Sequence, residues 1–372
     1  MKPRCSLLPK KKLAPDILLI AATLSLLVIG LIMVYSASAV MAEQNFNDSF
    51  FFLKRQLFFA ILGVVAMLFM MNVDYWSWRS LTKVIIIVCF ILLIVVLIPG
   101  VGLVRGGARS WLGVGAFSIQ PSEFMKIAMI FFLAKYLSEN QKYVTTIKQG
   151  LVPTLGLVMV AFALIMLQPD LGTGAVMVLT SVVIIFVAGA QIKHFAFLGI
   201  LGLVGFVGLI ISAPYRLQRI TSFLDPWQDP LGSGFQIIQS LYAIGPGGFL
   251  GLGLGESRQK YFYLPEPQTD FIFAIVSEEL GFVGGAFVLC CFAVLLWRGL
   301  RIALYAPDLY GSLLATGIIG MIAIQVMINI GVVIGLMPVT GITLPLLSYG
   351  GSSLTLMLTS IGVLLNISRH MR

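Results

Sequence analysis

The chain has 372 residues, of which 59% are apolar and only 10% are charged, whereas a soluble domain carries about 25% charged residues. Because a membrane-spanning helix needs about 20 apolar residues, this composition excludes a set of soluble domains. It predicts an all-α polytopic integral membrane protein with about ten transmembrane helices. The net charge of +9 does not indicate a nucleic-acid-binding protein, because the basic residues are scattered singly between apolar runs.

Ten apolar runs bounded by charged residues, proline or glycine predict the spans. In chain order they cover residues 16–39, 53–72, 80–98, 121–138, 151–168, 171–189, 194–213, 269–297, 311–335 and 348–366. We expect a single transmembrane domain over residues 1–372, with a basic cytoplasmic tail at residues 1–15 and extracytoplasmic loops at residues 99–120 and 214–268. The second loop joins the seventh and eighth helices, and long ordered loops of this kind commonly carry function.

The lysine and arginine residues predict the orientation of the chain. If both termini lie in the cytoplasm, 15 of the 24 basic residues fall on the inner side, as expected because short cytoplasmic loops carry an excess of Lys and Arg. Eleven of the 15 acidic residues then fall at or near the outer side, although acidic residues contribute little to orientation. This asymmetry indicates that the polar chemistry is concentrated at the outer face.

The residue types available at the outer face limit that chemistry. The sequence has no Walker-type phosphate loop, which excludes that kind of nucleotide site. The two histidines, His194 and His370, fall on the inner side, which excludes a Ser-His-Asp triad or a histidine-bound zinc ion outside. A general base at the outer face should therefore be a carboxylate or, less favourably, a lysine. The glycine cluster at residues 245–255 is interpreted as a packed turn or a re-entrant segment.

The first long loop contains Arg109 and Trp111. A tryptophan at this position is typical of an interfacial anchor, but the ring could equally form a platform beneath a sugar. Glu123 and Lys126 follow at positions i and i+3 of the fourth span, so they can neutralise each other on one helix face. Charges inside a membrane are costly enough that a functional role is the alternative.

The next polar positions lie at the ends of later spans. Asp170 lies at the turn between the fifth and sixth spans, where it could cap the sixth helix. Arg216 and Arg219 stand at i and i+3 just beyond the seventh span. They could extend to lipid headgroups, or they could hold a phosphate group, because the planar guanidinium suits bidentate contact.

Asp270 is the leading candidate for a base. It follows two prolines at the start of the eighth span, where Thr269 or Asp270 could cap the helix. The neighbouring phenylalanines would raise its pKa by desolvation, while the helix N-terminus would lower it. Glu278 and Glu279 lie deeper in the same span, so at least one should face the bundle interior or a wet cavity.

Several motifs resemble those of the SEDS family (shape, elongation, division and sporulation proteins: FtsW, RodA and SpoVE), and most closely its FtsW/SpoVE branch. The most specific is residues 264–274, Leu-Pro-Glu-Pro-Gln-Thr-Asp-Phe-Ile-Phe-Ala. The others are residues 34–38 (Val-Tyr-Ser-Ala-Ser), 107–112 (Gly-Ala-Arg-Ser-Trp-Leu), 120–123 (Gln-Pro-Ser-Glu), 168–173 (Gln-Pro-Asp-Leu-Gly-Thr), 245–255 and 345–353 (Pro-Leu-Leu-Ser-Tyr-Gly-Gly-Ser-Ser). Their order along the ten spans extends the resemblance over nearly the whole chain.

The resemblance implies a peptidoglycan glycosyltransferase of the bacterial cytoplasmic membrane, with its active site facing outward. Its substrates would be lipid II and the nascent glycan chain, and its partner a class B penicillin-binding protein with transpeptidase activity. The aspartate of the Thr-Asp-Phe motif, here Asp270, would be catalytic. The other positions that match functional positions of the family are Arg55, Trp111, Glu123, Lys126 and Asp170, and Arg109, Arg216 and Arg219 are supporting candidates.

These roles lead to an inverting mechanism. Asp270 would take the proton of the acceptor's 4-hydroxyl, and Arg55, Lys126 and one of the two arginines at 216 and 219 would stabilise charge on the departing pyrophosphate. No nucleotide is required, and a divalent cation, Mg²⁺ or Mn²⁺, is left open because the sequence has no dedicated ligand cluster. Two alternatives remain: a lipid II flippase or other transporter, and a non-catalytic scaffold for a penicillin-binding protein. The division, elongation or sporulation role is also left open.

Overall fold

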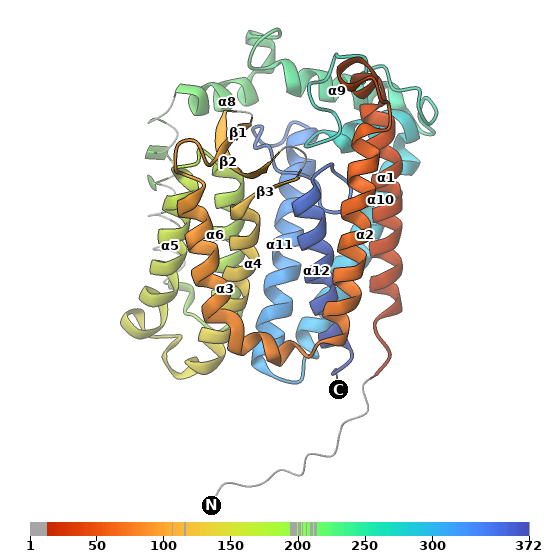
Figure 1. Cartoon of the computed structure of the whole chain (residues 1–372). Helices are drawn as coiled ribbons and strands as arrows, with labels where there is room; N and C mark the ends of the chain where they lie inside the picture. Colours follow the sequence, from red (N-terminus) through yellow and green to blue (C-terminus); the bar gives the residue numbers. More distant parts are fainter. Residues whose placement is uncertain are drawn as a thin grey trace, which may run out of the picture.

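The computed structural model describes residues 13–105, 107–114, 117–193 and 214–371, with single positions between 199 and 211. Its helices run side by side between two ends, and a layer of loops, strands and helices covers one end (Figure 1). The Leu13 N–H donates to the Arg369 carbonyl at 3.0 Å, so both described ends of the chain lie together, at the opposite end of the bundle (Figure 1). The assignment of that end to the cytoplasm rests on the distribution of lysine and arginine.

Nine long helices build the bundle in the described part of the chain. They are α1 (Ile17–Phe46), α2 (Phe51–Asn72), α3 (Tyr75–Val95), α4 (Pro121–Glu139), α5 (Val152–Met166), α6 (Leu171–Val187), α10 (Ile272–Leu304), α11 (Leu309–Val333) and α12 (Gly351–Ser368). The shorter elements are β1 (Leu103–Arg105), β2 (Ala108–Val114), β3 (Phe117–Ile119), α8 (Pro214–Leu224), α9 (Phe235–Gly247) and the turns η1 (Gln141–Tyr143), η2 (Ile147–Leu151) and η3 (Pro226–Gln228).

The predicted spans agree with these helices. Nine of the ten spans coincide with the nine long helices, and the seventh, residues 194–213, lies almost entirely outside the described residues. Seven helices in the described part of the chain are long and apolar enough to cross a membrane, with η2 and α5 counted as one. The prediction of an all-α polytopic membrane protein is therefore confirmed at this level.

Both long loops contain more regular structure than the sequence indicated. Within residues 99–120, β1, β2 and β3 form a small antiparallel sheet in that order. Within residues 214–268, α8, η3 and α9 precede a glycine-rich turn. Alternating apolar and polar residues are too few in such short strands to predict them.

The degree of burial separates central helices from peripheral ones. In the most apolar 18-residue window, 72% of α12 and 67% of α11 are buried, against 22% of both α2 and α3. The exposed residues of α2 and α3 are large and apolar, including Phe58, Ile61, Val84 and Ile87. This is the pattern expected where a bilayer, and not water, surrounds the outer helices.

Helix α10 is interrupted in its N-terminal third. Gly281 has a φ of 62° inside the helix, a conformation that favours glycine. The interruption frees the carbonyls of Glu278 and Glu279, which accept from the N–H groups of Leu252 (2.9 Å) and Gly253 (3.0 Å). The glycine cluster is therefore a turn packed against α10, as predicted.

The carboxylates at the interruption hold this turn through their side chains. Glu278 and Glu279 are 1% and 0% exposed. Glu279 accepts from the Ser36 hydroxyl of α1 at 2.6 Å, and Glu278 accepts from the Ser257 hydroxyl at 2.5 Å. The Lys260 ammonium lies 3.9 Å from Glu279. The prediction that at least one of the two glutamates faces the interior is confirmed, and both serve to join α1, α10 and the turn.

Candidate active site

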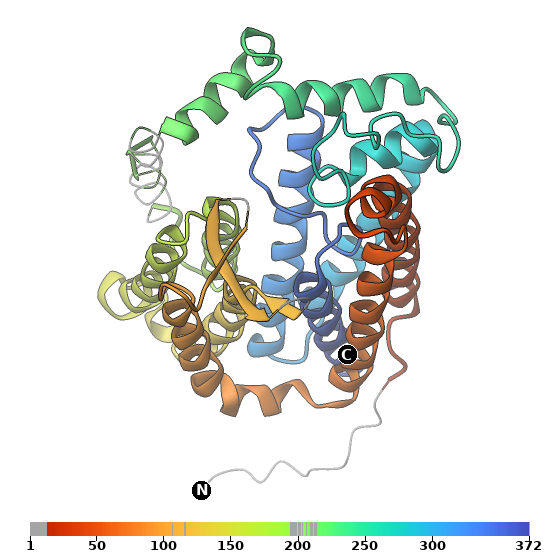
Figure 2. The same ribbon diagram turned by 45° about the horizontal axis from the view of Figure 1, so that its top comes forward.

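A cavity of about 1040 Å³ lies at the covered end of the bundle. Figure 2 shows α8 and α9 along one edge of this end, with the strands lying over the bundle. The lining comes from helices α1, α2, α4, α6, α8, α11 and α12, from strands β2 and β3, and from the segments before α10 and between α11 and α12. Most of the predicted site residues, although far apart in the sequence, meet at this cavity.

Asp270 lies in the cavity wall, in the irregular segment before α10. Its Oδ1 is 2.9 Å from the hydroxyl of Thr269, which is also 2.8 Å from the carbonyl oxygen of Glu266. The prediction that Thr269 or Asp270 caps the helix is wrong: α10 begins at Ile272, and Phe271 at the cap position makes no side-chain capping bond. Asp270 is therefore directed to the cavity and not to the helix backbone.

The pKa of Asp270 is raised above its ordinary value. Burial of the carboxyl group is the largest cause, and the charge of Glu266 acts in the same direction. The Thr269 hydroxyl and the charge of Arg219 oppose the shift but do not cancel it. The shift is in the direction that desolvation by the neighbouring residues predicts, and a raised pKa suits a carboxylate that accepts a proton near neutral pH.

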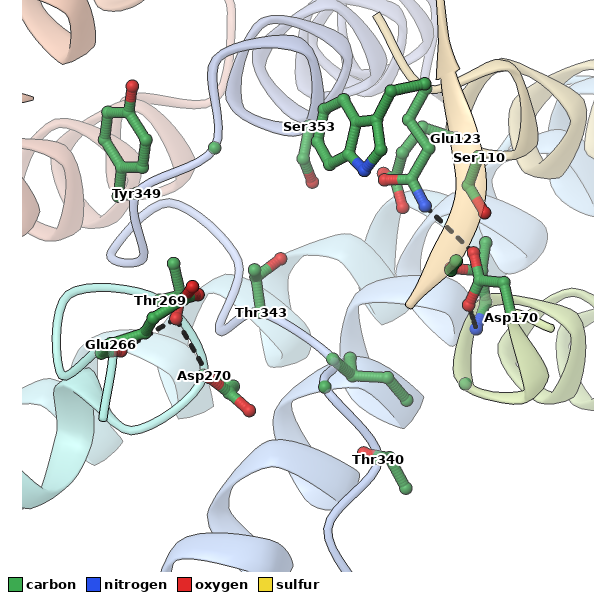
Figure 3. Close-up of a pocket in the computed structure, with 18 of the residues that line it drawn as sticks. Ser110, Glu123, Asp170, Glu266, Thr269, Asp270, Thr340, Thr343, Tyr349 and Ser353 are labelled. Atoms are coloured by element: carbon green, nitrogen blue, oxygen red, sulfur yellow. Dashed lines mark hydrogen bonds between the residues drawn. The ribbon is translucent and has the colours of Figure 1, made fainter. Parts of the chain in front are cut away.

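The opposite side of the cavity carries a second set of charges (Figure 3). The Lys126 ammonium and a carboxylate oxygen of Glu123 are 2.7 Å apart, and Lys126 is 4% exposed. This confirms the predicted i, i+3 pair on α4. A buried ammonium requires a partner of this kind.

Asp170 lies beside this pair. It accepts from the Thr173 N–H at 3.1 Å, which caps α6 as predicted, and from the Gln120 amide at 2.9 Å. Burial raises the pKa of Asp170. The oxygen that accepts from Gln120 also faces the Ser122 hydroxyl at 3.4 Å, so Asp170 joins the N-terminal ends of α4 and α6 at the cavity.

The remaining predicted residues differ in their positions. Arg55, Trp111 and Arg219 line the cavity. The Arg55 guanidinium lies 4.0 Å from the centre of the Phe51 ring, and Arg219 donates to the Val339 carbonyl at 3.0 Å. Arg109 does not line the cavity.

The side chain of Arg109 lies beside Gly102, where a Cβ atom would come within 2.8 Å of its Cγ. It therefore packs against the turn that precedes β1. The side chain of Arg216 lies outside the described residues. Of the supporting arginines, the structure therefore brings Arg55 and Arg219 to the site.

Two buried carboxamides hold the irregular backbone of the site, and the sequence did not indicate either of them. The Asn329 amide of α11 donates to the carbonyls of Asp270 (2.7 Å) and Ile342 (2.8 Å). The Gln56 amide of α2 donates to the Ser348 carbonyl at 3.0 Å. Polar residues in apolar helices were the available signal, but their partners lie far away in the sequence.

Hydroxyl groups also face the cavity. Ser110, Thr340, Thr343, Tyr349 and Ser353 line it from several elements (Figure 3). Hydroxyls spaced around a cavity with few charges suit the hydrogen-bonding groups of a sugar. The sequence could not have selected them, because serine and threonine are common throughout the chain.

The described residues do not gather three His, Cys, Asp or Glu side chains where they could hold a metal ion. Lys126 already pairs with Glu123, and Asp170 accepts from protein donors. The donor set at the cavity therefore does not fit a dedicated divalent cation site, and no step below uses one.

Comparisons with known proteins give consistent results. A model of a family described as cell cycle protein, FTSW_RODA_SPOVE, matches residues 17–372. The chain is 72% identical over 362 residues to the stage V sporulation protein E of Bacillus subtilis (strain 168), covering 97% of this chain and 99% of that protein. It is 44% identical over 357 residues to a protein of Trichlorobacter lovleyi (strain ATCC BAA-1151 / DSM 17278 / SZ) named probable peptidoglycan glycosyltransferase FtsW. This match covers 96% of this chain and 94% of that protein.

A solved structure is similar over the same extent. It is described as "Structural coordination of polymerization and crosslinking by a peptidoglycan synthase complex", and one of its chains is 33% identical to this one. The TM-score is 0.78, with 96% of this chain and 98% of that chain covered. The fold described above is therefore shared along nearly the whole chain.

Proposed function

The chain belongs to the SEDS family of FtsW, RodA and SpoVE proteins, and from this premise we propose that it polymerises lipid II into β-1,4-linked glycan strands at the outer face of the cytoplasmic membrane. Peptidoglycan glycosyltransferase is the activity in the name of its FtsW relative. Its similarity to stage V sporulation protein E assigns this synthesis to sporulation.

The observation that carries the proposal is the position of Asp270. Its carboxyl lies in the wall of a large cavity, opposite Asp170 and the Glu123–Lys126 pair (Figure 3). A base on one side and a cation on the other suit a displacement at a carbon held between them. The raised pKa of Asp270 makes it a better proton acceptor than a fully solvated aspartate.

The reaction is an inverting displacement. Asp270 takes the proton of the acceptor's 4-hydroxyl as its oxygen bonds to the anomeric carbon of the donor. The bond from that carbon to the pyrophosphate breaks, and its electron pair leaves with the pyrophosphate. Arg55, Lys126 and Arg219 stabilise the charge that develops there, and Glu123 holds Lys126 in place.

A class B penicillin-binding protein is the expected partner. The similar chain of known structure belongs to a study of polymerisation and crosslinking by a peptidoglycan synthase complex. A glycan polymerase supplies strands that a transpeptidase then crosslinks, so the two activities belong together. The described cavity itself carries the groups for the first activity only.

Asp270→Asn tests the proposal with a near-isosteric side chain that cannot accept the proton. Purified protein in liposomes is incubated with labelled lipid II, and glycan chains are measured. Loss of a general base lowers such rates by about 10²- to 10⁴-fold. Asp225→Asn is the matched control, because Asp225 caps η3 on the exposed surface of the same loop and should leave the rate unchanged.

The same assay separates the alternative functions. Polymer formed by Asp270→Asn at the wild-type rate would contradict the catalytic assignment. Translocation of lipid II without polymer in the wild-type protein would support the flippase. If the wild-type protein shows neither polymerisation nor translocation, the non-catalytic scaffold is the remaining alternative.

A further inference from the structure

Five described helices begin at the cavity. The first turns of α2, α4, α6 and α12, and the segment leading into α10, all contribute to its lining. A helix N-terminus carries partial positive charge, and its first N–H groups have no partner within the helix. The cavity is therefore surrounded by backbone donors as well as by charged side chains.

Three of these helix starts are associated with a carboxylate. Glu123 lies in the first turn of α4, Asp170 caps α6, and Asp270 lies two residues before α10. Helix α12 has no acidic residue in its first turn, and its cap residue, Gly350, makes no side-chain capping bond. Helix α2 has no acidic residue in its first turn either, but the N–H of its cap residue, Phe50, donates to the Asp48 carboxylate at 3.1 Å. Among the five, α12 alone begins without an associated carboxylate.

The polar groups of this turn are without partners. Ser352 is 7% exposed and lines the cavity, and its hydroxyl has no hydrogen-bond partner among the described residues. The N–H groups of Gly351, Ser352 and Ser353 likewise have none there. Of these three residues Ser352 is buried, whereas Gly351 and Ser353 are half-buried. A donor on a buried residue without a partner is costly, so an acceptor from a ligand is expected at this position.

The packing against α2 brings a cation to the same place. A Cβ atom on Gly351 would overlap the Phe59 ring of α2, so glycine permits a close approach of the two helices. The Gln56 side chain accepts from the Gly350 N–H at 3.2 Å, and the adjacent Arg55 lines the cavity. The start of α12 therefore combines free N–H groups, a buried hydroxyl and a neighbouring arginine.

We propose that the first turn of α12, with the Ser352 hydroxyl and the N–H groups of residues 351–353, binds the pyrophosphate of the lipid-linked substrate. This inference rests on the proposed function and adds the group that receives the leaving group's charge. Helix N-termini with glycine and serine are suited to phosphate because backbone donors and the helix dipole act together.

Ser352→Ala removes the hydroxyl with little change in volume. Binding of undecaprenyl pyrophosphate is measured on purified full-length protein in nanodiscs of neutral phosphatidylcholine. We expect binding about tenfold weaker, since one hydrogen bond to a charged group is lost. The matched control is Ser360→Ala, because Ser360 is a buried serine of the same helix that donates to the Leu356 carbonyl at 2.9 Å, away from the cavity.

A second variant, Ser353→Asp, should change pyrophosphate binding and thermal stability in opposite directions. Ser353→Asp places a carboxylate at the third position of α12, as the other helices have near their starts. It should abolish pyrophosphate binding while maintaining or raising the thermal stability of the protein, because an acid at a helix N-terminus is favourable. Loss of binding without loss of stability would separate a ligand site from a folding defect.

Three results would overturn the inference: wild-type binding by Ser352→Ala, wild-type binding by Ser353→Asp, or equal competition by phosphatidylglycerol. The last would mark a general phospholipid headgroup site. The binding measurement requires no turnover, so it is independent of the polymerisation assay. Asp270→Asn should bind undecaprenyl pyrophosphate normally, and failure of its polymerisation test would leave the binding result intact.

Discussion

Asn329 offers a test of how the fold positions Asp270. The residue is 1% exposed near the C-terminal end of α11, and its amide bridges the backbone carbonyls of Asp270 and Ile342. It does not line the cavity. Replacement by leucine, which has the same branched shape but carries no hydrogen-bonding group, removes both hydrogen bonds without creating a large cavity.

The expected effect follows from these two bonds. Each buried carbonyl left without its donor costs about 1–3 kcal/mol, so Asn329→Leu should destabilise the protein by about 2–6 kcal/mol in total. The Asp270 segment would also lose its fixed position, and a displacement of about 1 Å at a catalytic group can cost about 10²-fold in rate. We therefore expect a large fall in kcat with little change in KM.

The assay compares Asn329→Leu with Asn366→Leu. Asn366 is also fully buried in a helix, accepts from the Tyr75 N–H at 3.0 Å and donates to the Met71 carbonyl at 2.9 Å. Because Asn366 lies at the other end of the bundle, the Asn366→Leu variant should lose comparable thermal stability and keep the wild-type kcat for lipid II polymerisation. A wild-type kcat in Asn329→Leu, or an equal loss in both variants, would refute the positioning argument.

Three further predictions concern pH, packing and buried charge. Because the pKa of Asp270 is raised, the carboxylate should become protonated as the pH falls while the pH is still above the ordinary aspartate pKa of about 3.9. The initial rate of polymerisation should fall over the same pH range. A rate that stays constant down to a pH of about 3.9 would exclude Asp270 as the base. Because the folded protein holds this proton more tightly than the unfolded chain, the contribution of Asp270 to stability is greatest at low pH and decreases as pH rises towards its folded pKa. Gly30→Ala would place a Cβ atom 2.5 Å from the Leu346 carbonyl oxygen, whereas Gly156→Ala meets nothing within 4 Å. In a thermal unfolding assay Gly30→Ala should lower the free energy of unfolding by about 1–3 kcal/mol, and Gly156→Ala should leave it unchanged. Glu279→Ala removes the carboxylate partner of the buried Lys260, and unfolding should show a loss of about 3–5 kcal/mol; a variant as stable as wild type would show that the pair is not needed.

The local features of the site could be predicted from the sequence. The Glu123–Lys126 pair follows from a spacing of three residues on a helix, and the Asp170 cap follows from its position before an apolar run. Asp270 was identified as the candidate base from its motif and its place at the start of a span. Each of these inferences depends on residues within a few positions of one another.

The inferences that failed or were missed depend on distant residues. The capping role predicted for Thr269 or Asp270 is absent because the segment before α10 is held by Asn329, 59 residues later in the chain. Arg109 belongs to the same motif as Trp111, but the course of β2 takes it away from the cavity. Neither effect leaves a periodic pattern in the sequence.

The sequence by itself determined that this is a membrane protein. The hydropathy of each residue is independent of the fold, and a run of about 20 apolar residues has few stable environments other than a bilayer. It also indicated that the acidic residues gather towards one face. Only the tertiary structure decided which of them share a cavity, because that depends on how α2, α4, α10 and α12 pack together. The same packing brings the start of α12 to the cavity that Asp270 lines.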